Sequence, residues 1–96
     1  MKIISLSSVK EFAQAVRKLL QDLLAHHKIV MARKDKKELA NWQAFLHEVH
    51  VDIRNSVGRF PSNLRLDDPD VVAVLTATKI IAKLVNECKQ AYGKQA

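Results

Sequence analysis

The stretch DPDVVAVLTATKIIAKLVNECKQAYG, residues 68–93, decides which fold this chain can adopt. Asp68 can cap a helix through its side-chain oxygen, and Pro69 suits the first helical position, where its missing N–H costs nothing. Gly93 offers a left-handed stop at the other end. The β-branched residues in between weaken a helix slightly, but a strand of this length would far exceed the usual range of about 3–10 residues. Length and end signals therefore predict a helix over residues 69–92.

The apolar residues of this predicted helix lie on two stripes rather than one. The first stripe comprises Val71, Val74, Ile81, Leu84 and Cys88. The second comprises Val72, Leu75, Ala82 and Val85. A helix that is apolar around most of its circumference is typical of the centre of a bundle or of an interface. We therefore expect an apolar C-terminal helix in a central position, and the pattern leaves a homo-oligomer open.

A second helix is predicted near the N-terminus. Ser8 and Glu11 have the spacing of a capping box, in which each side chain bonds the other residue's backbone N–H. From residue 9 to residue 24 the apolar positions follow the helical period. Together these features predict a helix over residues 8–32.

The apolar seam changes phase within the charged run at residues 33–37. The next seam begins at Leu39 and is displaced by about two residues from the first, which indicates a turn or a stutter. Asp35 and Glu38 supply a further helix-start signal at the same place. We therefore predict an antiparallel hairpin whose second helix spans residues 36–57. One long helix is the alternative, because the chain has no Gly or Pro between residues 8 and 57.

Length and composition favour one small helical domain. The chain has 96 residues, is 48% apolar, and contains only two Gly and two Pro. An all-β fold needs many turns, so this scarcity favours long helices. We expect residues 1–96 to form a single all-α domain: a three-helix bundle with a long hairpin and an apolar C-terminal helix.

The sequence favours an intracellular location. Cys88 is the only cysteine, so no disulfide framework is available, and its place in an apolar stripe predicts packing rather than a reactive thiol. The N-terminal residues have too short an apolar run for a signal peptide, and no uncharged window approaches a membrane span. We expect a cytoplasmic protein that does not associate with a membrane.

The net charge of +6 lies entirely on the first third of the chain. Residues 1–37 hold nine Lys and Arg against three acidic residues, whereas residues 38–96 hold seven of each. Such asymmetry indicates an electrostatic partner: nucleic acid, an acidic protein surface or an anionic membrane. No aromatic residue is interleaved with the basic run in the sequence, so any nucleic-acid contact is expected at backbone phosphates rather than by base stacking.

Two segments supply the predicted partner-binding residues. The first is the basic tip of the hairpin; its alternative interpretation is a solvated turn. The second is the connection at residues 58–67, which exceeds the usual length of about 2–8 residues between bundle helices; its alternative role is to plug the end of the bundle. The predicted residues are Lys28, Arg33, Lys34, Lys36, Lys37, Arg59, Phe60 and Arg65.

No motif predicts catalysis, and a metal site is disfavoured. His47 and His50 lie three residues apart, and a hairpin would bring His26 and His27 within about one helical turn of His47. The zincin pattern needs one more spacer residue, however, and a third ligand is not evident. We interpret the four histidines as solvated, and we expect no cofactor and no enzymatic activity.

The segment LDDPDVVAVLTATKIIAKLVNECKQAYGK, residues 66–94, is similar to the capped apolar helices of small proteins from tailed bacteriophages. In size, charge and overall pattern the chain most resembles the anti-RecBCD proteins of lambdoid phages. That resemblance implies a non-enzymatic protein in the host cytoplasm that binds the RecC part of the recombination nuclease and alters its action on DNA ends. It identifies no individual site residue. The alternative is a direct, low-specificity DNA- or RNA-binding protein that uses the basic tip.

Overall fold

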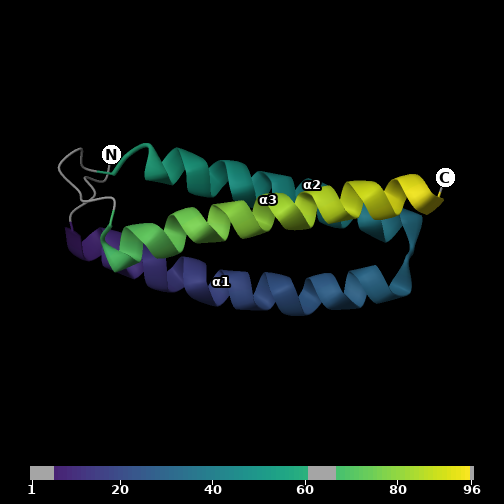
Figure 1. Ribbon diagram of the computed structural model, residues 1–96, viewed down its shortest axis with the longest axis horizontal. Coiled ribbons are helices and arrows are strands. Elements are labelled where there is room, and N and C mark those ends of the chain that lie inside the picture. Colours follow the sequence, from purple (N-terminus) through teal and green to yellow (C-terminus); the bar gives the residue numbers. More distant parts are fainter. Residues whose placement is uncertain (1–5, 61–66, 96) are drawn as a thin grey trace.

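Three helices make up the described part of the chain. The computed structural model describes residues 6–60 and 67–95. The helices are α1 (Leu6–Arg33), α2 (Lys36–Val57) and α3 (Pro69–Gln95). They run up, down and up along a bundle of 47 × 22 × 21 Å, so that the α1–α2 turn and the end of α3 lie at the same end (Figure 1). The predicted all-α three-helix bundle is confirmed.

The long hairpin consists of two separate helices joined by a two-residue turn. Lys34 adopts a left-handed backbone with φ of 55°, and its N–H still reaches the Val30 carbonyl at 3.2 Å. Asp35 then starts α2, because its side chain accepts a hydrogen bond from the Glu38 N–H at 2.9 Å. The single-helix alternative is therefore wrong, and the predicted bounds of the second helix are confirmed.

The start of α3 also follows its sequence signal. Asp68 accepts a hydrogen bond from the Asp70 N–H at its side chain and one from the Val72 N–H at its carbonyl. An ion pair of 3.3 Å between Arg17 and Asp70 then ties this first turn to α1.

Two predicted helix ends are wrong. Helix α1 begins at Leu6, so Ser8 lies inside the helix rather than at its cap; leucine is a good helix former and allows the extension. Helix α3 passes through Gly93 and ends at Gln95. Gly93 has no positive φ, so it acts as an ordinary helical residue and not as a left-handed stop.

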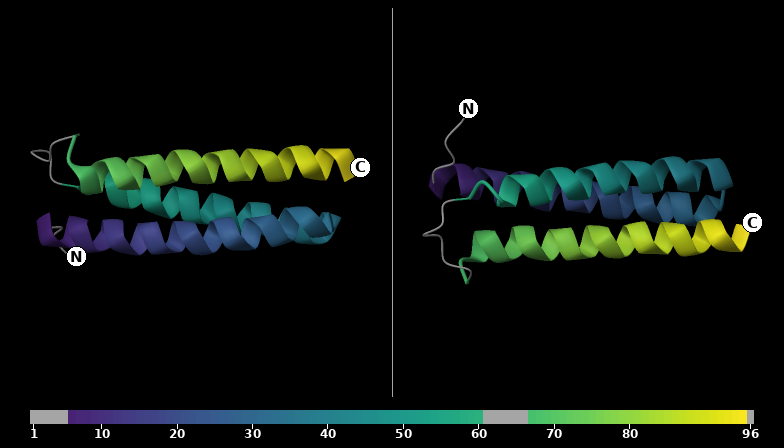
Figure 2. Two further views of the ribbon diagram at one scale, coloured as in Figure 1. Left: turned by 60° about the horizontal axis from the view of Figure 1, so that its bottom comes forward. Right: turned by 90° about the horizontal axis from the view of Figure 1, so that it is seen from above.

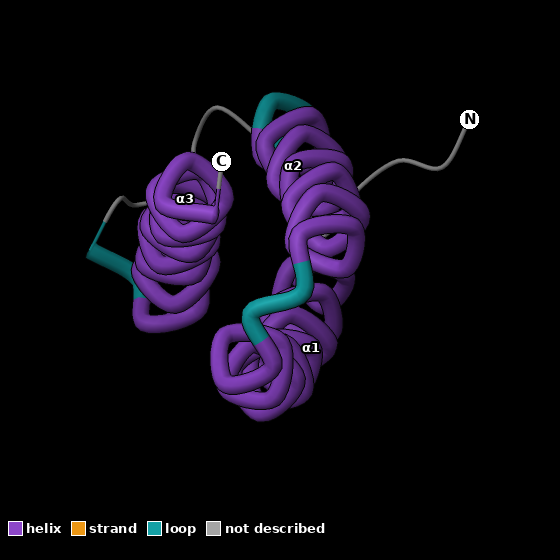
Figure 3. The backbone as a smooth tube through the Cα atoms, turned by 90° about the vertical axis from the view of Figure 1, so that its right-hand side faces the viewer, coloured by secondary structure: helices purple, strands orange, loops and turns teal. Residues whose placement is uncertain are grey.

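The core lies between α3 and the hairpin. Helix α3 runs alongside the hairpin of α1 and α2 (Figures 2 and 3). It packs along both of these helices, which contact each other much less. All five residues of the first α3 stripe are buried. In the second stripe Val85 is buried and Leu75 half-buried, but Val72 and Ala82 are exposed. Helix α3 therefore has one fully buried face, although it lies against both other helices.

A candidate binding site at the hairpin end

The five predicted cations near the turn form one exposed group, here called the hairpin end. It comprises Lys28, Arg33, Lys34, Lys36 and Lys37. Arg33 pairs with Glu38 at 3.0 Å, and the Lys36 ammonium lies 4.9 Å from the centre of the Tyr92 ring. The other three lysines form no ion pair with any described residue. The hairpin end therefore presents positive charge that acidic groups of the fold do not neutralise.

Helix α3 adds a cation that sequence reasoning missed. Lys94 lines a pocket of about 520 Å³ together with Lys28 and Lys34. Its position follows from the topology, because α3 runs parallel to α1 and ends beside the turn (Figure 1). All three helices therefore contribute cations to this end of the bundle.

Two of the three predicted loop residues, Arg59 and Phe60, lie at the opposite end of the bundle, beyond the C-terminus of α2 (Figure 1). Arg59 is exposed. Phe60 packs edge-to-face on Phe12 of α1, with 5.9 Å between ring centres, a contact that favours the plug interpretation for Phe60. Arg65 lies outside the described residues. The bundle is 47 Å long, so Arg59 and Phe60 do not form one compact site with the hairpin end.

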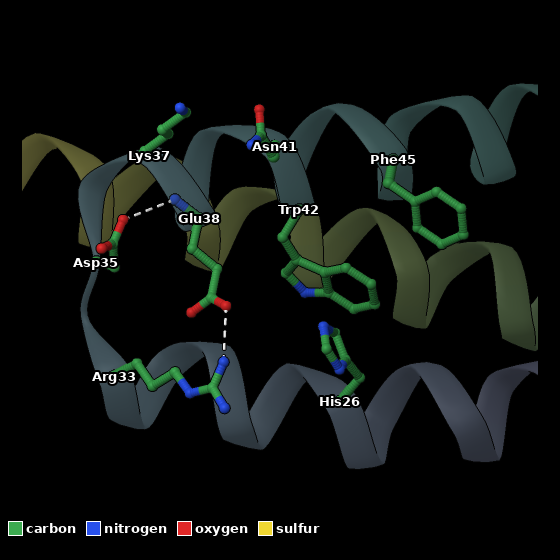
Figure 4. A pocket seen from close by; sticks show the side chains of 8 residues that line it. All are labelled: His26, Arg33, Asp35, Lys37, Glu38, Asn41, Trp42 and Phe45. Atoms are coloured by element: carbon green, nitrogen blue, oxygen red, sulfur yellow. Dashed lines mark hydrogen bonds and ion pairs between the residues drawn. The ribbon is translucent and has the colours of Figure 1, made fainter.

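Next to the hairpin end, a pocket of about 600 Å³ combines aromatic and charged side chains (Figure 4). We call it the aromatic–basic pocket. It is lined by His26, Arg33, Asp35, Lys37, Glu38, Asn41, Trp42 and Phe45. No aromatic residue is interleaved with the basic run in the sequence, but the fold places Trp42 and Phe45 in one pocket with Arg33 and Lys37.

The aromatic rings in this pocket contact one another closely. Phe45 stacks on Trp42 with 5.5 Å between ring centres and 19° between planes. His26 meets the Trp42 ring edge-on at 4.6 Å. Trp42 is 8% exposed, whereas Phe45 is 47% exposed. The Phe45 ring is therefore exposed to solvent while it packs against the buried Trp42 ring.

A buried hydrogen-bond network fixes Trp42. The indole N–H donates to Nδ1 of His27 at 3.0 Å, and Nε2 of His27 lies 2.9 Å from Oε1 of Glu87. An indole can only donate, so Nδ1 must accept and Nε2–H must donate to Glu87. His27 is therefore a neutral imidazole that links α1, α2 and α3. The interpretation of this histidine as solvated is wrong, since it is only 6% exposed.

The histidines and Cys88 are the other candidate groups in the sequence. Among the described residues no group of three His, Cys, Asp or Glu side chains could hold a metal ion. Burial lowers the pKa of His50, and the charges of Arg54 and His47 lower it further. Burial, with a smaller effect of Glu87, raises the pKa of Cys88 to about 11, so its thiol is protonated at neutral pH.

The chemistry of the aromatic–basic pocket suits binding. It contains no hydroxyl or thiol nucleophile. Asp35 is engaged as the α2 cap, and Oε2 of Glu38 accepts from Nη1 of Arg33. Oε1 of Glu38 is buried without a hydrogen-bond partner. Arg33 is 62% exposed at its side chain and uses one of its five N–H groups in this bond, so the others remain available to a ligand.

No protein-family model matches this chain, and no curated protein or solved structure shows significant similarity to it. The resemblance to anti-RecBCD proteins therefore stays an expectation from the sequence. None of the helices in the described ranges, 6–60 and 67–95, is long and apolar enough to cross a membrane.

Proposed function

We propose that this chain is a non-enzymatic binding protein that uses its hairpin end to attach to an acidic surface of a host protein complex acting on DNA. The observation that carries the proposal is the gathering of exposed cations from all three helices at one end of the bundle. Such charges accelerate encounter with an acidic partner and fix its orientation. The partner expected from the sequence resemblance is a RecBCD-type recombination nuclease, whose action the bound protein would modulate.

The test compares two charge-reversal variants of equal net charge. The first is Lys34→Glu/Lys36→Glu/Lys37→Glu at the hairpin end. The second is Lys10→Glu/Lys18→Glu/Lys83→Glu, at exposed positions outside the hairpin end. Affinity for the immobilised purified nuclease, measured at low salt, should fall by about tenfold or more in the first variant and far less in the second. Equal affinities for wild type and hairpin variant would contradict the proposal.

A second candidate function is direct, low-specificity binding of DNA or RNA through backbone phosphates. It is favoured by Lys28, Lys34 and Lys94 lining one pocket, an arrangement that can contact neighbouring phosphates. With about three phosphate contacts, one for each lysine, the logarithm of the binding constant for duplex DNA should fall with the logarithm of salt at a slope of about −2.7. A gel-shift series at several salt concentrations measures that slope, and no binding at low salt would exclude this function.

A further inference from the structure

The aromatic–basic pocket has a feature that phosphate binding alone does not use. Phe45 is 47% exposed although it lies beside the core residue Trp42. Single exposed apolar residues are common on protein surfaces. This ring, however, is stacked on Trp42, and Trp42 is itself held by His27. The pocket therefore contains an aromatic surface that is fixed before any ligand arrives.

The pocket is lined by two cations and two carboxylates, and of these Arg33 and Lys37 can contact a negatively charged chain, while Asp35 caps α2 and Glu38 pairs with Arg33. Lys37, Asn41 and Phe45 follow one another at intervals of four residues, so they share one face of α2. Arg33 of α1 points toward Glu38, whereas Lys37 and Asn41 project from α2 on the side away from α1 (Figure 4). Phe45 lies eight residues from Lys37, about 12 Å along the helix, a distance that roughly two extended nucleotides can bridge.

We propose that the aromatic–basic pocket binds single-stranded nucleic acid, with an unpaired base stacked on Phe45 and backbone phosphates on Arg33 and Lys37. The inference rests on the second candidate function, nucleic acid as a direct partner, and adds the form of nucleic acid that is bound. Aromatic stacking is open to any unpaired base, because every base has a flat face, whereas a duplex keeps those faces inside its own stack. The pocket therefore selects single strands without selecting a sequence.

The test measures fluorescence anisotropy of a labelled oligodeoxythymidine of about twelve nucleotides and of a duplex of equal length. Wild type should prefer the single strand, and binding should quench the emission of Trp42, the only tryptophan. Phe45→Ala should lower single-strand affinity by about tenfold or more and leave duplex affinity unchanged. Phe45→Leu keeps apolar area but removes the ring, so it should lose most of the same preference.

Two controls keep the result interpretable. Val51→Ala removes an exposed apolar group of α2 that does not line the pocket, and it should change neither affinity. Circular dichroism of the Phe45 variants should match wild type, because this ring is half exposed.

Three other outcomes would each overturn the inference. Equal affinity for single strand and duplex, unchanged in Phe45→Ala, would overturn the stacking site and leave phosphate binding standing. No nucleic-acid binding at low salt would overturn both. A Phe45→Ala variant that loses affinity for the nuclease but not for the oligonucleotide would assign the pocket to a protein partner and overturn the inference.

Discussion

The hydrogen bond between Trp42 and His27 should contribute measurably to the stability of the bundle. Both side chains are more than nine-tenths buried, and 3.0 Å separates the two nitrogens. His27→Leu fills the site with an apolar side chain but leaves the indole N–H without a partner. A buried unsatisfied donor costs about 1–3 kcal/mol, so we expect the free energy of unfolding to fall by that amount. Glu87 is 40% exposed at its side chain and can turn to water, so it adds little to the loss.

A double-mutant cycle isolates this bond. Trp42→Phe leaves Nδ1 of His27 unpaired and a void where part of the indole stood, for a loss of about 2–3 kcal/mol. The double variant contains neither unpaired group, so its loss should fall short of the sum of the single losses by about 1–2 kcal/mol. Urea unfolding followed by far-ultraviolet circular dichroism measures all four proteins, since Trp42→Phe removes the only tryptophan.

The control cycle pairs His27→Leu with Ile53→Val, a buried position about three turns further along α2 than Trp42. These two losses should add to within about 0.5 kcal/mol. The same additivity for His27→Leu and Trp42→Phe would refute the network as a coupled unit. It would also remove the evidence that Trp42 and His27 hold the Phe45 ring in place before a ligand binds.

Three further predictions concern the backbone, the thiol and the core. Lys34→Gly should raise the free energy of unfolding by about 0.5–1 kcal/mol in urea titrations, because it relieves a left-handed backbone and keeps the hydrogen bond to Val30; a lower urea midpoint would contradict this. Cys88 should react with iodoacetamide far more slowly in the native than in the unfolded chain. Folding raises the pKa of this thiol from 9.0 to about 11, so the thiol contributes stability that is complete below pH 9.0 and is lost as the pH rises toward about 11. The variant Cys88→Ala should not show this loss. Val74→Asp and Ile81→Asp should each unfold the bundle, because a buried unpaired carboxylate costs several kcal/mol against a total stability of roughly 5–15 kcal/mol; an unchanged melting temperature would show that these positions face solvent.

The parts of the fold that sequence reasoning predicted depend on local chemistry. Asp35 and Asp68 bond backbone groups within four residues, so their cap signals are complete in the sequence. Ser8 and Gly93 are equally common helix-end residues, yet α1 extends through Ser8 and α3 extends through Gly93. A single cap residue competes with the helix preference of its neighbours and cannot by itself fix an end.

The candidate pocket depends on contacts that local sequence does not contain. His27 lies four residues after Leu23 and three before Val30, a spacing that could have identified it as a core position. Its partner Glu87 is sixty residues away, however, so the network requires the packed bundle. Phe45 falls beside the apolar seam of α2 and could be predicted as exposed. Its proximity to Arg33 follows only from the way the hairpin folds back.

Lysine footprinting tests most directly whether the hairpin end is the binding surface. The amines of the free protein and of its complex are acetylated under matched conditions, and mass spectrometry compares the extent of labelling at each lysine. In complexes with the nuclease or the oligonucleotide, we expect protection of Lys28, Lys34, Lys37 and Lys94, and undiminished labelling of Lys18. Protection confined to Lys18 and other lysines that belong neither to the hairpin end nor to the adjacent end of α3, or uniform labelling in a saturated complex, would contradict the account.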